Sequence, residues 1–112
     1  MEVKSVAKNT GVPARKMRRL VDMIRGKPVD EAMTLLRFAP SPNARIVARV
    51  VKAATADAES VYQIPSSELR IVGIFADEAL TLKRYRAGAR RRVKHILKRS
   101  SHITVIVGEQ EA

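Results

Sequence analysis

A long basic segment near the end of the chain limits what the chain can fold into. Residues 83–99 read KRYRAGARRRVKHILKR, nine of these seventeen residues are Lys or Arg, and no acidic residue occurs within residues 79–108. Lys and Arg side chains are almost never fully buried without an opposite charge. We therefore expect this segment to stay outside the hydrophobic core and to project from the folded part of the chain.

Both flanks of the basic segment have the composition of β-strands. Residues 68–82 alternate in polarity and are rich in Leu, Ile, Val and Phe, and residues 93–107 end in the β-branched run ITVIV. β-branched residues are enriched in strands. Two such strands joined through Gly88 predict a β-hairpin, whose extended part covers about residues 78–100. At a rise of about 3.3 Å per residue, the stretch from Leu80 to Gly88 would reach about 26 Å.

The first half of the chain has helical periodicity after a short strand at residues 2–9. A first helix starts at Pro13, which suits the first helical position, and ends near Gly26. A second helix covers residues 29–38 and a third covers about residues 42–62. The apolar side chains expected to face the core are Met17, Leu20, Val21, Ile24, Ala32, Leu35, Leu36, Ile46, Val47, Val50, Val51, Ala54, Ala58 and Val61.

These elements predict an α+β fold, with three helices packed on a three-stranded antiparallel sheet from which a long basic β-hairpin protrudes. The chain has 112 residues, a length typical of one domain. We expect residues 1–112 to form that single domain. With two Phe, two Tyr and no Trp, its core must be built mainly from aliphatic side chains.

The charge balance indicates a polyanionic partner. Twenty-two Lys and Arg residues stand against eleven Asp and Glu, for a net charge of +11 and a pI near 10.9. A pI above about 9 is typical of nucleic-acid-binding domains. In residues 83–99 Arg outnumbers Lys six to three. This favours RNA, because guanidinium groups stack on bases and bind phosphates through paired hydrogen bonds.

The basic segment is open to other interpretations. In the free protein it could be a disordered arm rather than a hairpin, and this alternative stays open. A solvated charge run would carry interspersed acids, which this segment lacks. A DNA-architectural protein with a basic β-ribbon arm often inserts an apolar wedge at the arm tip, for which Ala87-Gly88-Ala89 is poorly suited. A membrane-surface protein would need large apolar residues opposite the charges.

A second group of cations lies on the first predicted helix. Arg15, Lys16, Arg18 and Arg19 have only Asp22 as a nearby counter-charge. We therefore expect them to bind RNA rather than to form an ordinary solvated helix face. The residues predicted to bind RNA are Arg15, Lys16, Arg18, Arg19, Arg25, Lys83, Arg84, Arg86, Arg90, Arg91, Arg92, Lys94, Lys98 and Arg99.

Motifs for catalysis and for metal binding are missing from the sequence. It has no Gly-rich phosphate loop, no cysteine for a disulfide or a thiolate zinc site, and only two histidines. Ser100-Ser101-His102 lacks an acid close in sequence to orient the histidine. We expect Asp77-Glu78 to pair with Arg or Lys across the hairpin. No enzyme activity, catalytic residue, metal or cofactor is therefore expected, and no apolar stretch approaches the ~20 residues that span a bilayer.

The segment from Ile96 to Val107, which reads ILKRSSHITVIV, resembles the C-terminal signature of the bacterial-type family of large-subunit ribosomal protein number 22. The sequence His-Ile-Thr-Val after Lys-Arg-Ser-Ser is fairly specific, and the resemblance covers essentially the whole chain. The other segments that resemble the family are Lys83-Arg84 with the basic run after it, Ala14-Arg15-Lys16-Met17-Arg18 with Val21 and Ile24-Arg25-Gly26, and Ala53-Ala54 through Ala58-Glu59.

This resemblance implies a structural constituent of the large subunit of the cytoplasmic ribosome, present as a monomer and bound to 23S rRNA. It implies that the hairpin bridges several RNA domains during assembly and lines the exit tunnel of the nascent peptide. The hairpin tip would narrow that tunnel together with large-subunit ribosomal protein number four. Carried onto this chain, the tunnel-lining tip consists of Arg86, Ala87, Gly88, Ala89, Arg90 and Arg91.

The tip departs from the family in two respects. The family commonly has a Pro-Arg-Ala-x-Gly-Arg-Ala pattern there, whereas the aligned run in this chain is AGARRRV at residues 87–93. The glycine therefore stands at position 88 instead of 91, and the proline is absent. The family pattern does not define the turn at this tip.

Overall fold

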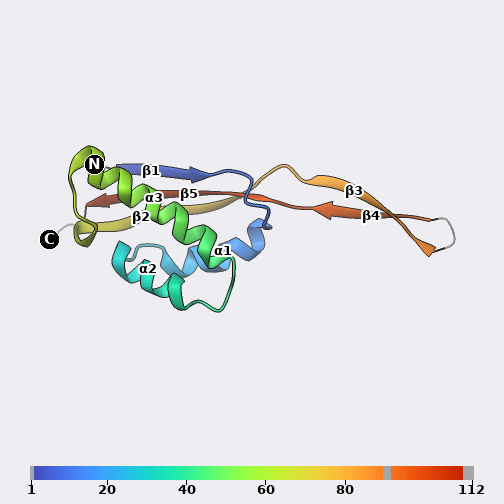
Figure 1. Cartoon of the computed structure of the whole chain (residues 1–112), viewed down its shortest axis with the longest axis horizontal. Coiled ribbons are helices and arrows are strands. Elements are labelled where there is room, and N and C mark those ends of the chain that lie inside the picture. Colours follow the sequence, from blue (N-terminus) through green and yellow to red (C-terminus); the bar gives the residue numbers. More distant parts are fainter. Residues whose placement is uncertain (1, 90–91, 110–112) are drawn as a thin grey trace.

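The computed structural model describes residues 2–89 and 92–109, without the side chains of Lys94 and His95. The molecule measures 65 × 26 × 17 Å along its principal axes, and a narrow two-stranded ribbon forms one end of the long axis (Figure 1). Its elements in chain order are β1 (Glu2–Ala7), α1 (Ala14–Ile24), α2 (Val29–Phe38), α3 (Ala44–Tyr62), the 3-10 turn η1 (Ser66–Glu68), β2 (Leu69–Glu78), β3 (Leu82–Ala87), β4 (Val93–Lys98) and β5 (Ser101–Glu109).

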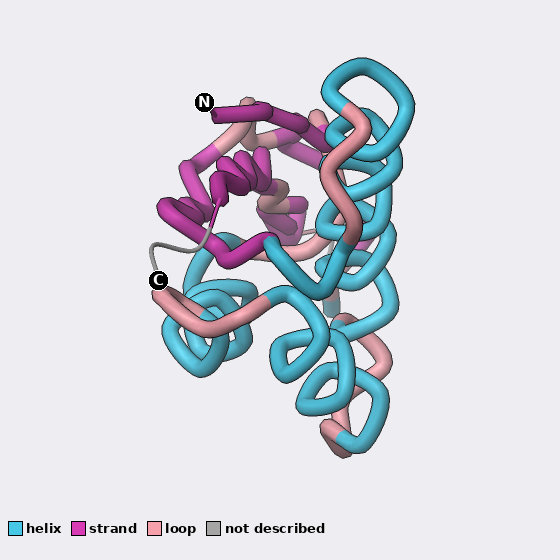
Figure 2. The backbone as a smooth tube through the Cα atoms, turned by 90° about the vertical axis from the view of Figure 1, so that its left-hand side faces the viewer, coloured by secondary structure: helices cyan, strands magenta, loops and turns pink. Residues whose placement is uncertain are grey.

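The main sheet has three antiparallel strands in the order β1-β5-β2, so the last strand of the chain lies in its centre. In the register, Lys4 of β1 stands opposite Ile106 of β5, and Ile74 of β2 stands opposite Val105. The helices gather on one side of the strands when the molecule is viewed along its length (Figure 2). The predicted α+β class, with three helices and a three-stranded antiparallel sheet, is confirmed.

The core lies between the helices and the sheet and is aliphatic, as predicted. The apolar stripes of α1 and α3 and the inward-facing residues of β2 and β5 form a single buried cluster. No aromatic side chain belongs to this cluster among the residues that the structure describes. The side chains that are completely inaccessible to solvent include those of Met17, Val21, Ile24, Val47, Val51, Ile71, Ile74, Ile103, Val105 and Val107.

Three side chains that were predicted to face the core are less buried than expected. Leu35 and Ile46 are only partly buried, and Val61 is 67% exposed. α3 ends at Tyr62. The next residue, Gln63, adopts a left-handed conformation, and the backbone N–H of Ile64 donates to the carbonyl of Ala58. This reversal directs Ile64 rather than Val61 into the end of the core, where it is buried.

The two long strands predicted at residues 68–82 and 93–107 are both interrupted. The first stops at Glu78 and resumes at Leu82, and the second pauses between Lys98 and Ser101. Across the gap a single backbone hydrogen bond, from the N–H of Ala79 to the carbonyl of Ser100 (3.1 Å), links the two chain segments. Outside the gap, β3 and β4 pair as a separate two-stranded sheet, here called the hairpin ribbon.

Side chains at the interruption bind the loop that precedes α1. Ser101 is completely buried, and its hydroxyl donates to the carbonyl of Val12 (2.7 Å). Ser101 Oγ also lies 2.8 Å from Thr10 Oγ1, so the two hydroxyls share a second hydrogen bond. The backbone N–H of Gly11 donates to Ser100 Oγ (2.9 Å), and that of Asn9 donates to His102 Nδ1 (3.0 Å). We call this junction of residues 9–12, 79–81 and 99–102 the neck.

Replacing Ser101 with Ala is expected to lower the free energy of unfolding by about 1–2 kcal/mol, because two buried hydrogen bonds lose their shared hydroxyl. Urea denaturation followed by circular dichroism measures the change. Ser60→Ala, at an exposed position on α3, is the matched control and should stay within about 0.5 kcal/mol of the parent. Equal stabilities of the two variants would contradict a structural role for the neck.

Candidate RNA interface

The hairpin ribbon has two different faces. Successive residues of a strand point to opposite sides, and residues paired across an antiparallel ladder share a side. The register pairs Arg84 with Ile96 and Leu82 with Lys98, so one face carries Arg84, Arg86 and Lys98 together with Leu82 and Ile96. We call it the cationic face, because three of these five residues are basic. The other face, called the apolar face, carries Lys83, Tyr85, Ala87, Val93 and Leu97.

The described side chains of the hairpin ribbon are exposed, from Leu82 to Ala87 and again from Ile96 to Arg99. None of the described residues between positions 77 and 102 belongs to the apolar core. The ion pairs found among the described residues are Arg25–Asp22 and Lys27–Glu31, both within the helical layer. The described cations of the ribbon are therefore available to an external polyanion.

Asp77 and Glu78 were expected to pair with cations across the hairpin, and this prediction is wrong. In the ladder Asp77 stands opposite His102 and Glu78 stands opposite Ser101. The cations of the ribbon begin beyond the interruption, at Lys83. The two carboxylates are exposed at the end of β2, beside the neck, and no ion pair involving either of them occurs among the described residues.

The cations of α1 and Arg25, which directly follows this helix, are all exposed and divide into two groups by their contacts. Arg15, Lys16 and Arg19 line a groove between α1 and α2. Arg18 donates from Nε to the carbonyl of Ala76 (3.2 Å), and Arg25 donates to the carbonyl of Ile74 (3.0 Å). Both acceptors lie on β2, an edge strand of the main sheet. Edge strands present unpaired backbone groups. These two arginines therefore supply hydrogen-bond donors to two backbone carbonyls of β2.

The neck brings one predicted cation of the ribbon segment close to α1. A cleft of about 310 Å³ is lined by Arg15 and Arg18 of α1 and by Arg99, together with the carboxylate of Glu78. The far end of the ribbon lies away from the helices, at the opposite end of the long axis (Figure 1). The predicted residues thus form two cationic regions, one at the neck and α1 and one on the ribbon, rather than a single patch.

Part of the predicted tip lies outside the residues that the structure describes. Arg90 and Arg91 are not among the described residues, and for Lys94 only the backbone, paired with Arg86, is described. On the tip's flanks, the backbone N–H of Gly88 donates to the carbonyl of Arg92 (2.6 Å), and that of Arg92 donates to the carbonyl of Ala89 (3.3 Å).

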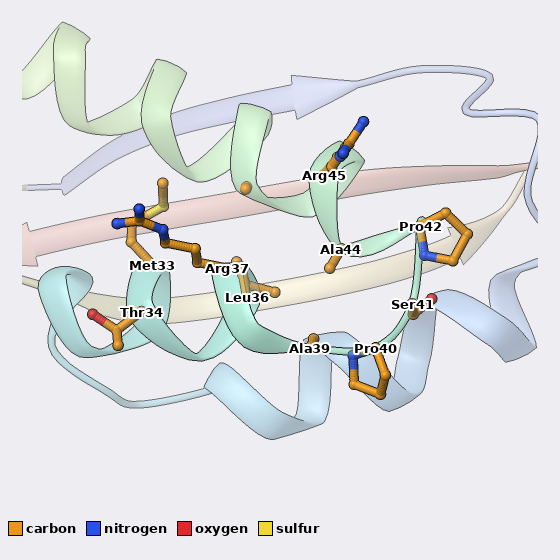
Figure 3. A pocket seen from close by; sticks show the side chains of 11 residues that line it. Met33, Thr34, Leu36, Arg37, Ala39, Pro40, Ser41, Pro42, Ala44 and Arg45 are labelled. Atoms are coloured by element: carbon orange, nitrogen blue, oxygen red, sulfur yellow. The ribbon is translucent and has the colours of Figure 1, made fainter.

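Two cations that the sequence interpretation omitted line a hollow between α2 and α3. It has a volume of about 870 Å³, and Arg37 of α2 and Arg45 of α3 border it beside Pro40 and Pro42 of the connecting loop (Figure 3). A charge pattern in the sequence would have identified these two cations. Residues 32–56 contain four Arg and Lys residues and no acid, a second acid-free stretch comparable to the one that marks the hairpin.

The described residues contain no group of three or more His, Cys, Asp or Glu side chains that could hold a metal ion. Among the helices of the described chain, none is both long enough and apolar enough to cross a membrane.

Replacing Arg25 with Ala is expected to lower the free energy of unfolding by about 1 kcal/mol, because the carbonyl of Ile74 loses a charged donor and the exposed carboxylate of Asp22 loses its partner. Arg19→Ala removes the same charge from an exposed position of α1 and serves as the control. Its unfolding free energy should match that of the parent within about 0.5 kcal/mol. If chemical denaturation gives the same loss of unfolding free energy for both variants, the hydrogen bond from Arg25 to the sheet edge does not stabilise the fold.

Comparison with known proteins agrees with the resemblance noted in the sequence. The family model for ribosomal protein L22p/L17e matches residues 5–108. Proteins named large ribosomal subunit protein uL22, from three strains of Dehalococcoides mccartyi, are each 55% identical over 109 residues, which cover 97% of this chain and 100% of the relative. The chain therefore belongs to the L22p/L17e family of ribosomal proteins.

Proposed function

We propose that this protein is a structural constituent of the large ribosomal subunit in the cytoplasm, that it binds 23S rRNA, and that it acts without catalysis. The observation that carries the proposal is the hairpin ribbon, which displays cations outside the core with no acidic residue between positions 79 and 108. The names of its relatives, which describe large-subunit proteins, support the same assignment.

The ribbon suits a narrow space between RNA helices. Two paired strands are only about 5 Å apart in the ladder direction, so the ribbon can pass where a globular domain cannot. Each phosphate that a Lys or Arg neutralises releases condensed counterions, and this release favours binding. Arg84, Arg86 and Lys98 on the cationic face would contact phosphates, while Tyr85 on the apolar face has a ring that can stack on a base.

The extent of the two cationic regions together supports a bridging role. One region lies on α1 and at the neck, and the other adjoins it where Lys98 precedes Arg99 and extends along the ribbon to one end of a molecule that is 65 Å long (Figure 1). RNA segments that approach each other repel through their phosphates. A protein that neutralises both segments at once lowers that repulsion, and in this way it would join RNA domains during subunit assembly.

The tip of the ribbon, residues 86–91, would line the tunnel through which the nascent peptide leaves, next to large-subunit ribosomal protein number four. This part of the proposal rests on family membership and on the length of the ribbon. The protein would act there as a monomer in the ribosome.

Replacing Arg84, Arg86 and Lys98 with Ala is expected to weaken binding to a large-subunit rRNA fragment and to reduce the slope of log affinity against log salt by about 2–3, at ~0.7–0.9 per phosphate contact. Filter binding over a salt series measures both. The matched control replaces Lys4, Lys8 and Arg70, three exposed cations on the main sheet and beside it, and should change the slope by less than about 1.

The same assay with bent duplex DNA tests the class of nucleic acid. Tighter binding to the DNA than to the rRNA fragment would support a DNA-architectural protein with a basic ribbon arm and would contradict the proposal. An equal change of slope for the two triple variants would show that the ribbon makes no special contribution.

A further inference from the structure

The groove between α1 and the end of α2 has lining residues beyond the cations named above. Its volume is about 940 Å³. Leu20 and Met23 of α1 and Leu35 of α2 line it, and each of them is partly or fully buried. The loop at residues 39–43 contributes to its lining. The groove therefore has an apolar base that is open to solvent.

One of the residues that line this groove is a largely exposed aromatic. Phe38, the last residue of α2, is 77% exposed, in a chain that has only two Phe, two Tyr and no Trp. The guanidinium carbon of Arg37 lies 6.0 Å from the centroid of the ring, at the limit of a cation–π contact. A flat ring left open beside an arginine is the arrangement on which proteins stack unpaired bases.

The wall that α1 contributes to the groove is cationic. Arg15, Lys16 and Arg19 line it, and none of the residues that line the groove is acidic. Three cations therefore line one apolar depression, and a fourth, Arg37, lies beside the Phe38 ring. This charge suits a ligand that joins an apolar plane to negative groups.

We propose that this groove binds one unpaired nucleotide of RNA, with its base stacked on Phe38 and its flanking phosphates on Arg15, Lys16 and Arg19. The inference rests on the proposed RNA-binding function and adds to it a place where a base leaves its stack. An acidic amphipathic peptide would also satisfy the charge. The single open ring beside a guanidinium favours a planar base, because a peptide helix would place apolar side chains in a row of pockets.

A tryptophan reporter tests the stacking directly. Phe38→Trp gives the chain its only Trp, and a short oligoadenylate is expected to quench its fluorescence saturably. Val61→Trp, at a position on α3 that is 67% exposed and outside the groove, is the matched control and should show no saturable quenching. Equal quenching by an abasic oligonucleotide of the same charge, or by poly-glutamate, would overturn the proposal, because neither ligand has a base.

A binding assay separates this inference from the proposed function. Phe38→Ala is expected to weaken binding to the rRNA fragment about tenfold, within the range given by loss of one stacked base, and to leave the salt slope unchanged because the ring carries no charge. Phe38→Tyr should restore the affinity. If Phe38→Ala binds like the parent while the ribbon triple variant still loses affinity, the groove proposal fails and the RNA-binding function stands. If both variants bind like the parent, the proposed function fails as well.

Discussion

Repulsion among the cations of residues 83–99 is the constraint on which the rest of the structure depends. Nine positive charges without an interspersed acid cannot be buried in a core, and an isolated two-stranded ribbon has little stability of its own in water. The chain therefore folds into two parts with different sources of stability. The helices and the main sheet form an aliphatic core that includes none of the described residues between positions 77 and 102, and the ribbon is left for an external polyanion to stabilise.

The neck joins these two parts. Ser101 is fully buried and binds the loop before α1 through Thr10 and Val12, so the base of the ribbon is held by the core. The same loop leads into α1, and Arg18 of α1 and Arg25, directly after it, donate to carbonyls of the β2 edge. The position of the ribbon relative to the α1 cations is thus determined by hydrogen bonds rather than by the charges themselves.

Local patterns predicted most of the fold, and tertiary contacts account for what they missed. Periodicity located α1, α2 and α3 and most of the core positions on them, and the acid-free stretch predicted exposed cations. Sequence periodicity could not show that Gln63 would reverse the chain and leave Val61 exposed. Nor could it show that Arg18 and Arg25 would bind a sheet edge, because β2 lies about 50 residues further along the chain. The groove at Phe38 is likewise formed only when α1 and α2 pack together.

Amide hydrogen exchange of the free and the RNA-bound protein tests the central claim most directly, because it reports local opening at each backbone N–H. The account predicts that amides of β3 and β4 exchange rapidly in the free protein and become protected when an rRNA fragment binds. Amides of β2 and β5 in the main sheet should be protected in both states. Strong protection of β3 and β4 without RNA, unchanged when RNA is added, would contradict a ribbon that depends on a polyanion for its order.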